Sequence, residues 1–332
     1  MEERLIQIED QNEQSETALR QQLSLQTITQ APFIPHATRE NPFVVGAITV
    51  TEVCNLSCVM CHFNGPKAPK KAGTLLTSQV ESYLTQVPKE TEMWFAATGE
   101  LFLDPNAVYY LRRAFELGLK PCVLSHGQQF TPELLDQVLE AGVRMVRMSV
   151  DTTDAELYRK IRRGGEFYRI LEACTYLRES KKQYPGLRVE INATLFKNTF
   201  PKQDEMIEFW RGKVDQVNFN AEYHDTFRFR NTFFVPERRN DCRLQLLLVP
   251  SGRIAPCCAM QVHQHYHDLT WLPHIDEVSL EDAYTRLCDM YDDPSSPLGK
   301  ICKDCDWWIL NANYDAEYKT PYLRCVPLEP VP

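Results

Sequence analysis

Short apolar runs and longer amphipathic stretches alternate along the middle of the chain. Apolar runs bounded by glycine, proline or polar residues are typical of buried strands, and apolar positions three and four apart are typical of helices. The expected strands cover 44–51, 93–97, 121–125, 144–150, 187–195 and 214–218, and the expected helices cover 77–86, 105–117, 132–141, 154–182 and 202–211. Because strands that alternate with helices build βαβ units, the pattern predicts an α/β fold with six parallel strands and right-handed crossovers.

Capping residues and glycines set the expected ends of these helices. Thr77 or Ser78 is the expected N-cap of the first helix, since a hydroxyl group there accepts a hydrogen bond from the backbone. Gly118 and Gly142 follow the second and third helices, as is common for residues that terminate a helix. The longest helical stretch is expected to break near Gly164.

The two ends of the chain differ from this pattern. Residues 1–31 are polar and glutamine-rich with a thin apolar stripe, which predicts one helix that is either a solvated arm or a docking segment for a partner. After residue 220 the alternation stops, and 244–257 has the pattern of a hairpin with its turn at Ser251-Gly252. We therefore expect an N-terminal arm over 1–42, a core domain over 43–220 and a C-terminal domain over 221–332.

The composition is that of a globular chain with a net charge of −9 over 332 residues. An acidic chain has no general electrostatic attraction for nucleic acid or for an anionic membrane, and no apolar run reaches the roughly 20 residues that span a bilayer. The first residues lack the basic and then apolar pattern of a signal peptide. Twelve cysteines without an export signal indicate metal binding in a reducing cytoplasm rather than a disulfide framework.

Three of these cysteines lie close together, directly after the first expected strand. Cys54, Cys58 and Cys61 have C-x3-C-x2-C spacing, so that a single loop presents all three thiols. Thiolates bind soft metals and iron–sulfur clusters, whereas a structural zinc site normally has four protein ligands. Three thiolates on a four-iron cluster leave one iron without a protein ligand, and that iron is open to a substrate or cofactor.

Polar loops follow the later strands, and together with the cysteine triplet they resemble the radical S-adenosylmethionine (SAM) superfamily. Gly99-Glu100, after the second strand, resembles the glycine–glutamate motif that holds the methionyl amino group of SAM, with one glycine in place of the usual two. The other matches are Ser125 after the third strand, Ser149 and Asp151 at the end of the fourth, and Asn192 on the fifth. The resemblance implies that these residues line the SAM site, with Ser149 and Asp151 near the ribose and the carboxylate.

This resemblance implies a partial (β/α)6 barrel of the TIM type, with a [4Fe–4S] cluster on the triplet and SAM on its open iron. Reduction of such a cluster cleaves SAM homolytically, and the 5′-deoxyadenosyl radical removes a hydrogen atom from a substrate. The protein then has to position the radical and exclude solvent. A flavodoxin- or ferredoxin-type reductant is the implied partner that supplies the electron.

A second group of cysteines lies in the C-terminal third. Cys242, Cys257, Cys302 and Cys305 have C-x14-C spacing followed by a distant C-x2-C. A hairpin and a tight turn can bring four thiols together, and a structural zinc site would use the same ligand set. The arrangement resembles the auxiliary-cluster domain of the SPASM/twitch branch, and the lack of further cysteines directly after Cys305 favours the shorter twitch form. The resemblance implies a second [4Fe–4S] cluster.

The reaction is expected to depend on residues in the C-terminal third. Cys258 neighbours Cys257, and the radical SAM sugar epimerases that this layout resembles use a thiol to return a hydrogen atom to the substrate radical. A packed core thiol, or a ligand that replaces Cys257, is the alternative interpretation of Cys258. Glu222 and His224 follow the sixth strand, where polar side chains hydrogen-bond a polyol, act as a base, or simply form a solvated loop.

We therefore expect epimerisation or dehydrogenation at a carbinol carbon of a sugar or aminocyclitol. A radical SAM enzyme that forms crosslinks or thioethers in peptides is one alternative. A metal-binding or redox protein without enzymatic activity is the other, and it predicts that no SAM is cleaved.

Overall fold

The computed structural model describes residues 45–65, 73–96, 98–196, 199–221, 244–258, 260, 269–303, 305 and 324–328. Its strands are β1 (Val45–Thr49), β2 (Ser57–Cys58), β3 (Glu92–Ala96), β4 (Lys120–Ser125), β5 (Met145–Ser149), β6 (Arg162–Arg163), β7 (Arg188–Leu195), β8 (Gln216–Ala221), β9 (Leu247–Leu248), β10 (Ile254–Ala255) and β11 (Arg324–Pro327). Its α-helices are α2 (Thr77–Leu84), α3 (Ala107–Glu116), α4 (Pro132–Glu140), α5 (Ala155–Ile161), α6 (Phe167–Ser180), α7 (Gln203–Trp210), α9 (Leu280–Asp292) and α10 (Pro297–Lys303), and the 3-10 helices are η1 (Leu101–Leu103) and η2 (Phe200–Lys202).

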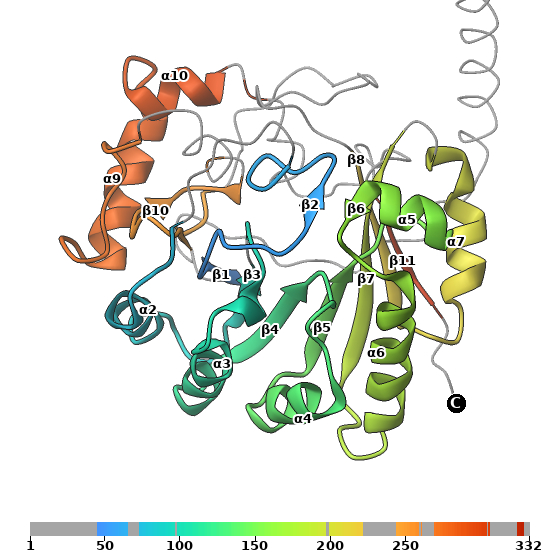
Figure 1. The fold of residues 1–332 in the computed structure, drawn as a ribbon. Coiled ribbons are helices and arrows are strands. Elements are labelled where there is room, and N and C mark those ends of the chain that lie inside the picture. Colours follow the sequence, from blue (N-terminus) through green and yellow to red (C-terminus); the bar gives the residue numbers. More distant parts are fainter. Residues whose placement is uncertain are drawn as a thin grey trace, which may run out of the picture.

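Most of the described strands belong to one sheet, in the order β10-β9-β1-β3-β4-β5-β7-β8-β11. The strands β1, β3, β4, β5, β7 and β8 pair in parallel, each with the next. These six strands are the ones that the sequence predicts, and helices connect them (Figure 1). The prediction of an α/β fold with a mostly parallel sheet is confirmed, and the arrangement is consistent with a partial (β/α)6 barrel.

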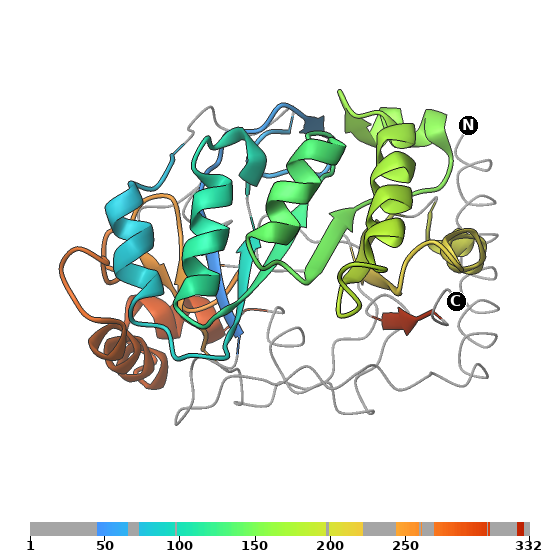
Figure 2. The same ribbon diagram turned by 90° about the horizontal axis from the view of Figure 1, so that it is seen from below.

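One face of the sheet packs against helices. Figure 2 shows α3, α4 and α6 lying across this face. Alternate strand residues supply the core: Phe95, Val146, Ile191 and Val217 are each fully buried in one cluster with residues of these helices, such as Leu111, Leu135 and Ile170. Successive side chains of a strand point to opposite faces of the sheet. The residues between these core positions, such as Arg147 and Glu190, therefore lie on the other face.

Two of the expected helix ends are confirmed, and one expected cap is wrong. Gly118 and Gly142 follow α3 and α4 with φ of +83° and +93°, a region that other residues rarely adopt. The N-cap of α2 is Leu76. The Gln79 side chain stabilises this end of the helix by accepting a hydrogen bond from the backbone N–H of Leu76 at 3.1 Å. Thr77, an expected cap, lies inside α2 and its hydroxyl group instead hydrogen-bonds Tyr110 of α3 at 3.1 Å.

The expected break near Gly164 is confirmed, since α5 ends at Ile161 and α6 begins at Phe167. Between these helices lies β6, which pairs antiparallel with β2 in a separate two-stranded sheet. The sequence pattern does not predict this pairing, because strands of two residues carry no periodicity.

The C-terminal segment adds strands to both sides of the parallel core. The expected hairpin is confirmed as β9 and β10, and β9 pairs in parallel with β1. On the opposite side β11 pairs antiparallel with β8. Side-chain hydrogen bonds join this segment to α2 and the turn after it. The Tyr83 hydroxyl donates to the Leu246 carbonyl, Gln79 Nε2 donates to Asp276 Oδ2 at 2.8 Å, and Gln86 Oε1 accepts from the Leu280 amide at 2.9 Å.

The helix expected over 1–31 lies outside the described residues, and the three domain boundaries stay predictions. In the part of the chain that the structure describes, no helix has both the length and the apolar character needed to cross a membrane.

Candidate functional site

The cysteine loop follows β1 at the carboxyl end of the parallel strands (Figure 1). Cys54 and Cys61 are half-buried and Cys58 is buried. Backbone N–H groups point at two of the sulfurs: Leu56 donates to Cys54 Sγ at 3.4 Å, and Phe63 and Asn64 donate to Cys61 Sγ at 3.4 and 3.2 Å. Backbone N–H groups of the loop therefore surround these two sulfurs. Such donors stabilise negative charge on a thiolate.

Contacts at both ends hold this loop in place. Ser57 and Cys58 in the loop form β2, and Cys58 pairs with Arg162 of β6. The amide of the next residue, Val59, donates to the Ile161 carbonyl at 2.9 Å. At the loop's far end, the Asn64 side chain donates to the Glu52 carbonyl at 3.0 Å, so that the loop closes back on the segment from which it started.

The Gly99-Glu100 loop lies directly against the segment that leads to Cys54. The Gly99 amide donates to the Thr51 carbonyl at 3.1 Å and the Glu100 amide donates to the Val53 carbonyl at 2.8 Å. A Cβ atom on Gly99 would lie 2.1 Å from the Val53 carbonyl oxygen, so only glycine permits this approach.

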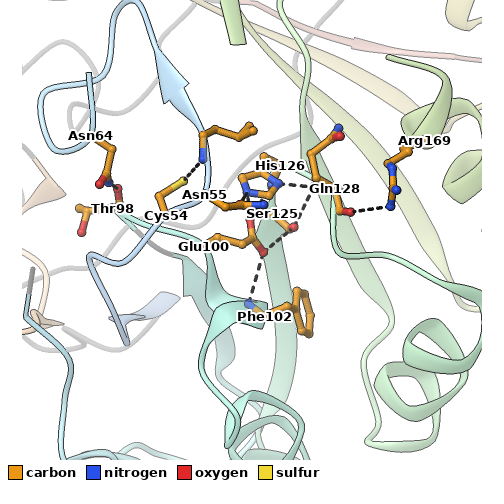
Figure 3. A network of polar contacts seen from close by, with 12 residues as sticks. Cys54, Asn55, Asn64, Thr98, Glu100, Phe102, Ser125, His126, Gln128 and Arg169 are labelled. Atoms are coloured by element: carbon orange, nitrogen blue, oxygen red, sulfur yellow. Dashed lines mark hydrogen bonds and ion pairs between the residues drawn. The ribbon is translucent and has the colours of Figure 1, made fainter. Parts of the chain in front are cut away.

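The Glu100 carboxylate is buried and accepts three hydrogen bonds. Ser125 Oγ donates to Oε1 at 2.8 Å, the His126 amide donates to Oε2 at 3.0 Å, and the Phe102 amide donates to Oε1 at 3.3 Å (Figure 3). Burial raises the pKa of Glu100 to about 6, against the lowering effect of these donors. The carboxylate is therefore ionised at neutral pH and its orientation is fixed.

His126 joins this carboxylate to the cysteine loop. Its Nε2 lies 2.9 Å from Asn55 Oδ1 and 3.3 Å from Glu100 Oε2, and its Nδ1 accepts the Gln128 amide at 3.1 Å. Burial, together with the nearby Arg162 guanidinium, lowers the pKa of His126 to about 3. The imidazole is therefore neutral.

Asp151 is fully buried and forms a two-pronged ion pair with Arg162, with Nε–Oδ2 and Nη2–Oδ1 distances of 2.7 and 3.0 Å. Its Oδ1 also accepts the Thr194 amide at 2.9 Å. Both carboxylate oxygens are thus occupied by protein donors. The pKa of Cys58 is raised to about 11 by burial, with Arg162 acting in the opposite direction, and burial raises the pKa of Cys54 to about 12.

Ser149 and Asn192 are partners in the register of β5 and β7, and both are half-buried. Asn220 of β8 donates to Asn192 Oδ1 at 2.7 Å, which leaves the Asn192 amide nitrogen facing away from Asn220. A hydroxyl and an amide group therefore stand side by side at the strand ends, where βα architectures place ligand contacts.

The second cysteine group is described in part. Cys257 and Cys258 follow β10, with Cys257 half-buried and Cys258 exposed. Cys302 and Cys305 form a tight turn in which the Cys305 amide donates to the Cys302 carbonyl at 3.4 Å, and both are half-buried. Cys242, Glu222 and His224 lie outside the described residues, so their predicted roles stay predictions.

The donor set fits a cluster better than a single metal ion. Within the described ranges, no three His, Cys, Asp or Glu side chains converge as the ligands of one metal ion do. A four-iron cluster takes each protein thiolate on a different iron, so the thiolate sulfurs need not converge on one point. Thr98 Oγ1, next to Asn64 in Figure 3, is buried without a hydrogen-bond partner among the described residues, as expected beside a ligand site.

Sequence reasoning did not assign roles to Asn55, His126 and Arg162. Asn55 is a polar residue inside the cysteine spacing, and Arg162 is one of the paired arginines before Gly164. His126 stands in the Ser125-His126-Gly127 segment that follows the third expected strand and resembles a Thr-Asn-Gly segment of the superfamily. Asn55 and His126 are 71 positions apart in the sequence, so their contact depends on the assembled sheet.

Comparison with known proteins supports the same interpretation. The family model of the radical SAM superfamily matches residues 48–210. A GTP 3′,8-cyclase of Rhizobium leguminosarum bv. trifolii is 24% identical over 171 residues, which is 50% of this chain and 48% of that protein. An AdoMet-dependent heme synthase of Methanosarcina barkeri is 27% identical over 161 residues, covering 48% of this chain and 44% of that protein. The chain thus spans about half the length of the curated relatives it matches.

A solved structure resembles the fold over more of the chain. SuiB of Streptococcus suis, bound to its precursor peptide SuiA, superposes with a TM-score of 0.57 at 15% identity and covers 89% of this chain and 71% of that chain. At this identity the similarity concerns the fold.

Proposed function

Residues 48–210 match the family model of the radical SAM superfamily, and on that premise we propose that Cys54, Cys58 and Cys61 bind three irons of a [4Fe–4S] cluster whose fourth iron is open to SAM. The activity that we propose is that of a radical SAM enzyme, which the family match and the relatives support. The observation that carries the assignment of ligands is the loop itself. It stands at the strand ends and supplies three thiols, with backbone donors already directed at the Cys54 and Cys61 sulfurs.

When bound, the cluster and SAM supply a 5′-deoxyadenosyl radical, which removes a hydrogen atom from a substrate C–H bond. The chain's own part is to hold SAM beside the loop. The backbone of Gly99-Glu100 is bonded to the segment before Cys54, which supports its assignment to the methionyl amino group. Ser149 and Asn192 have better support than Asp151 as SAM contacts, because both oxygens of Asp151 are bonded to Arg162.

The substrate that we propose is a sugar or aminocyclitol that reacts at a carbinol carbon. In epimerisation, the Cys258 thiol gives its hydrogen atom to the substrate radical from the opposite face. The resulting thiyl radical returns to the thiol by taking up one electron from a flavodoxin- or ferredoxin-type reductant and one proton. In dehydrogenation, the substrate radical would instead give one electron to an auxiliary cluster held by the second cysteine group and one proton to Glu222 or His224 as the base. The exposure of Cys258, directly beside Cys257, supports its role as a hydrogen donor.

A second [4Fe–4S] cluster on Cys242, Cys257, Cys302 and Cys305 belongs to the same proposal. The C-x2-C turn and the hairpin that carries Cys257 support it, since they present thiols from two short, rigid connections. Iron and sulfide analysis distinguishes the two cases: two clusters give eight iron atoms per chain and one cluster gives four.

Peptide modification is the second candidate. SuiB, whose structure contains a precursor peptide, shares its fold with this chain over 89% of the chain. A substrate test therefore needs peptides as well as sugars.

The decisive experiment incubates the reconstituted, reduced protein with SAM and candidate substrates in deuterium oxide. Formation of 5′-deoxyadenosine is expected, and its absence with every reductant would refute radical SAM activity. One deuterium at an inverted carbon identifies an epimerase, whereas a ketone that has lost two hydrogens identifies a dehydrogenase. Cys258→Ala is expected to abolish epimer formation while SAM cleavage continues, and epimer formation by this variant would rule out the thiol as hydrogen donor.

A further inference from the structure

Asn55 lies between Cys54 and Cys58, and its side chain forms a hydrogen bond with a residue directly after β4. Its Oδ1 lies 2.9 Å from His126 Nε2, at the end of β4 (Figure 3). Asn55 follows Cys54 directly and precedes Leu56, whose amide donates to the Cys54 sulfur. The orientation of the Asn55 side chain therefore bears on the backbone that surrounds this thiol.

The imidazole of His126 has a single possible proton position. Its Nδ1 accepts the Gln128 amide proton at 3.1 Å and so carries none of its own. A neutral imidazole then carries its proton on Nε2 and donates it toward Asn55 Oδ1, with Glu100 Oε2 close by at 3.3 Å. The carboxylate next to this N–H favours the same tautomer.

The far side of His126 is also rigid. Gln128, which fixes Nδ1, is itself held by the junction of α5 and α6: its Oε1 accepts the Glu166 amide at 2.8 Å, and its Nε2 donates to the Tyr158 hydroxyl at 3.2 Å. Both Gln128 and Tyr158 are buried. His126 thus has little freedom to follow a moving loop, and the loop has to conform to His126.

We infer that His126 is a positioning residue: through its Nε2–H it fixes Asn55, and with it the Cys54 end of the cysteine loop, relative to the Glu100 loop. This inference rests on the proposed function, in which the first loop holds the cluster and the second contacts SAM. Removing a residue that orients a metal ligand without contacting the metal typically lowers metal affinity or activity by roughly 10-fold to 100-fold. We therefore expect SAM affinity to depend on the His126–Asn55 contact.

Two replacements of His126 separate the roles of its two nitrogens. In glutamine the amide nitrogen lies at the same number of bonds from Cβ as Nε2, so His126→Gln keeps a donor toward Asn55 and gives up the Nδ1 acceptor. In asparagine the amide oxygen corresponds to Nδ1, so His126→Asn keeps the acceptor for the Gln128 amide and gives up the donor. If His126 acts through Nδ1, the two variants rank in the opposite order. If it acts through packing alone, Asn55→Leu, which leaves the imidazole in place, keeps the wild-type SAM affinity.

The test records the electron paramagnetic resonance spectrum of each reconstituted, dithionite-reduced protein during a titration with SAM. The part of the signal that SAM changes reports the cluster with the open iron, and its titration gives the SAM dissociation constant. We expect His126→Gln to match the wild type, and His126→Asn to weaken SAM binding by about 10-fold or more with an altered signal. Asn55→Leu, which removes the acceptor from the other side, is expected to match His126→Asn, and the double variant is expected to be no worse than either single one.

Each other outcome counts against a specific claim. A wild-type spectrum that does not respond to SAM overturns the proposed function and this inference with it. A responsive wild type with an unchanged His126→Asn variant, or a His126→Gln variant as impaired as His126→Asn, overturns the inference alone. Should His126→Asn fail to fold, an Asn55→Leu variant with the wild-type signal and SAM affinity overturns it as well.

Discussion

At the scale of single residues, Gly99 is where the site tolerates least change. A Cβ atom there would lie 2.1 Å from the Val53 carbonyl oxygen and 2.5 Å from the Glu52 carbonyl carbon, and both are backbone atoms that cannot rotate away. Gly99→Ala is therefore expected to destabilise the fold by roughly 1–3 kcal/mol and to displace the segment that leads to Cys54. Thermal unfolding and the iron content after reconstitution measure the two effects.

Gly186→Ala is the matched control for this variant. No atom lies within 4 Å of a Cβ atom built at Gly186, so the substitution is expected to change stability by less than about 1 kcal/mol and to leave the iron content unchanged. Equal effects of the two substitutions would contradict the close approach at Gly99.

His126 gives a prediction about pH. Its pKa is about 3 in the folded protein, against about 6.5 in the unfolded chain, so the unfolded chain binds an extra proton as the pH falls below about 6.5. Stability from this group is therefore lost on acidification. Relative to His126→Gln, the wild type is expected to lose about 1.4 kcal/mol of unfolding free energy between about pH 7.5 and about pH 5.5.

Urea unfolding of both cluster-free proteins across this range measures the difference. Glu100 acts in the opposite direction, because its pKa is raised to about 6, and the folded state holds its proton more tightly as the pH falls. Because Glu100 Oε2 lies 3.3 Å from His126 Nε2, its titration would differ between the two proteins, so both are compared in a Glu100→Gln background. A difference that stays constant with pH would show that His126 is not buried in its neutral form.

At the scale of elements, β6 is a two-residue strand that a buried ion pair joins to the main sheet. Arg162 joins β6 to the buried Asp151 after β5, while its backbone pairs with Cys58 of β2. Arg162→Met is expected to cost about 3–5 kcal/mol, since it leaves the Asp151 carboxylate buried and without its ionic partner.

Arg159→Met is the control for Arg162→Met. Arg159 forms its ion pair with Glu166 at the surface, where both side chains are more than half exposed, so its removal is expected to cost less than about 1 kcal/mol. Chemical unfolding measures the loss of unfolding free energy in each variant. A similarly small loss in both would mean that water enters and solvates the Asp151 carboxylate when Arg162 is removed.

The elements also show how far the sequence alone leads. The six core strands are predictable because their apolar residues are continuous and are bounded by glycines and prolines. The β2–β6 pairing is not, because two residues carry no pattern, and neither is the cap of α2, where Thr77 hydrogen-bonds a tyrosine of another helix. Among the site residues, the cysteine spacing is a local signal, whereas the Asn55–His126 contact exists only once β4 stands beside the loop.

At the scale of the whole molecule, the C-terminal third does more than carry cysteines. Its strand β9 lies against β1 and its strand β11 lies against β8, so that it covers both outer strands of the parallel core. An uncovered outer strand presents unpaired N–H and C=O groups that can pair with another chain.

A chain that ends at Ala221 would retain the cysteine triplet and all six parallel strands, yet would have both outer strands exposed. We expect it to aggregate, or to form oligomers in size-exclusion chromatography at concentrations where the full chain does not. A monomeric truncated protein would contradict this expectation. If the truncated protein aggregates, the C-terminal segment protects the parallel core from self-association, because it shields the two edges along which copies of this sheet would otherwise pair into fibres.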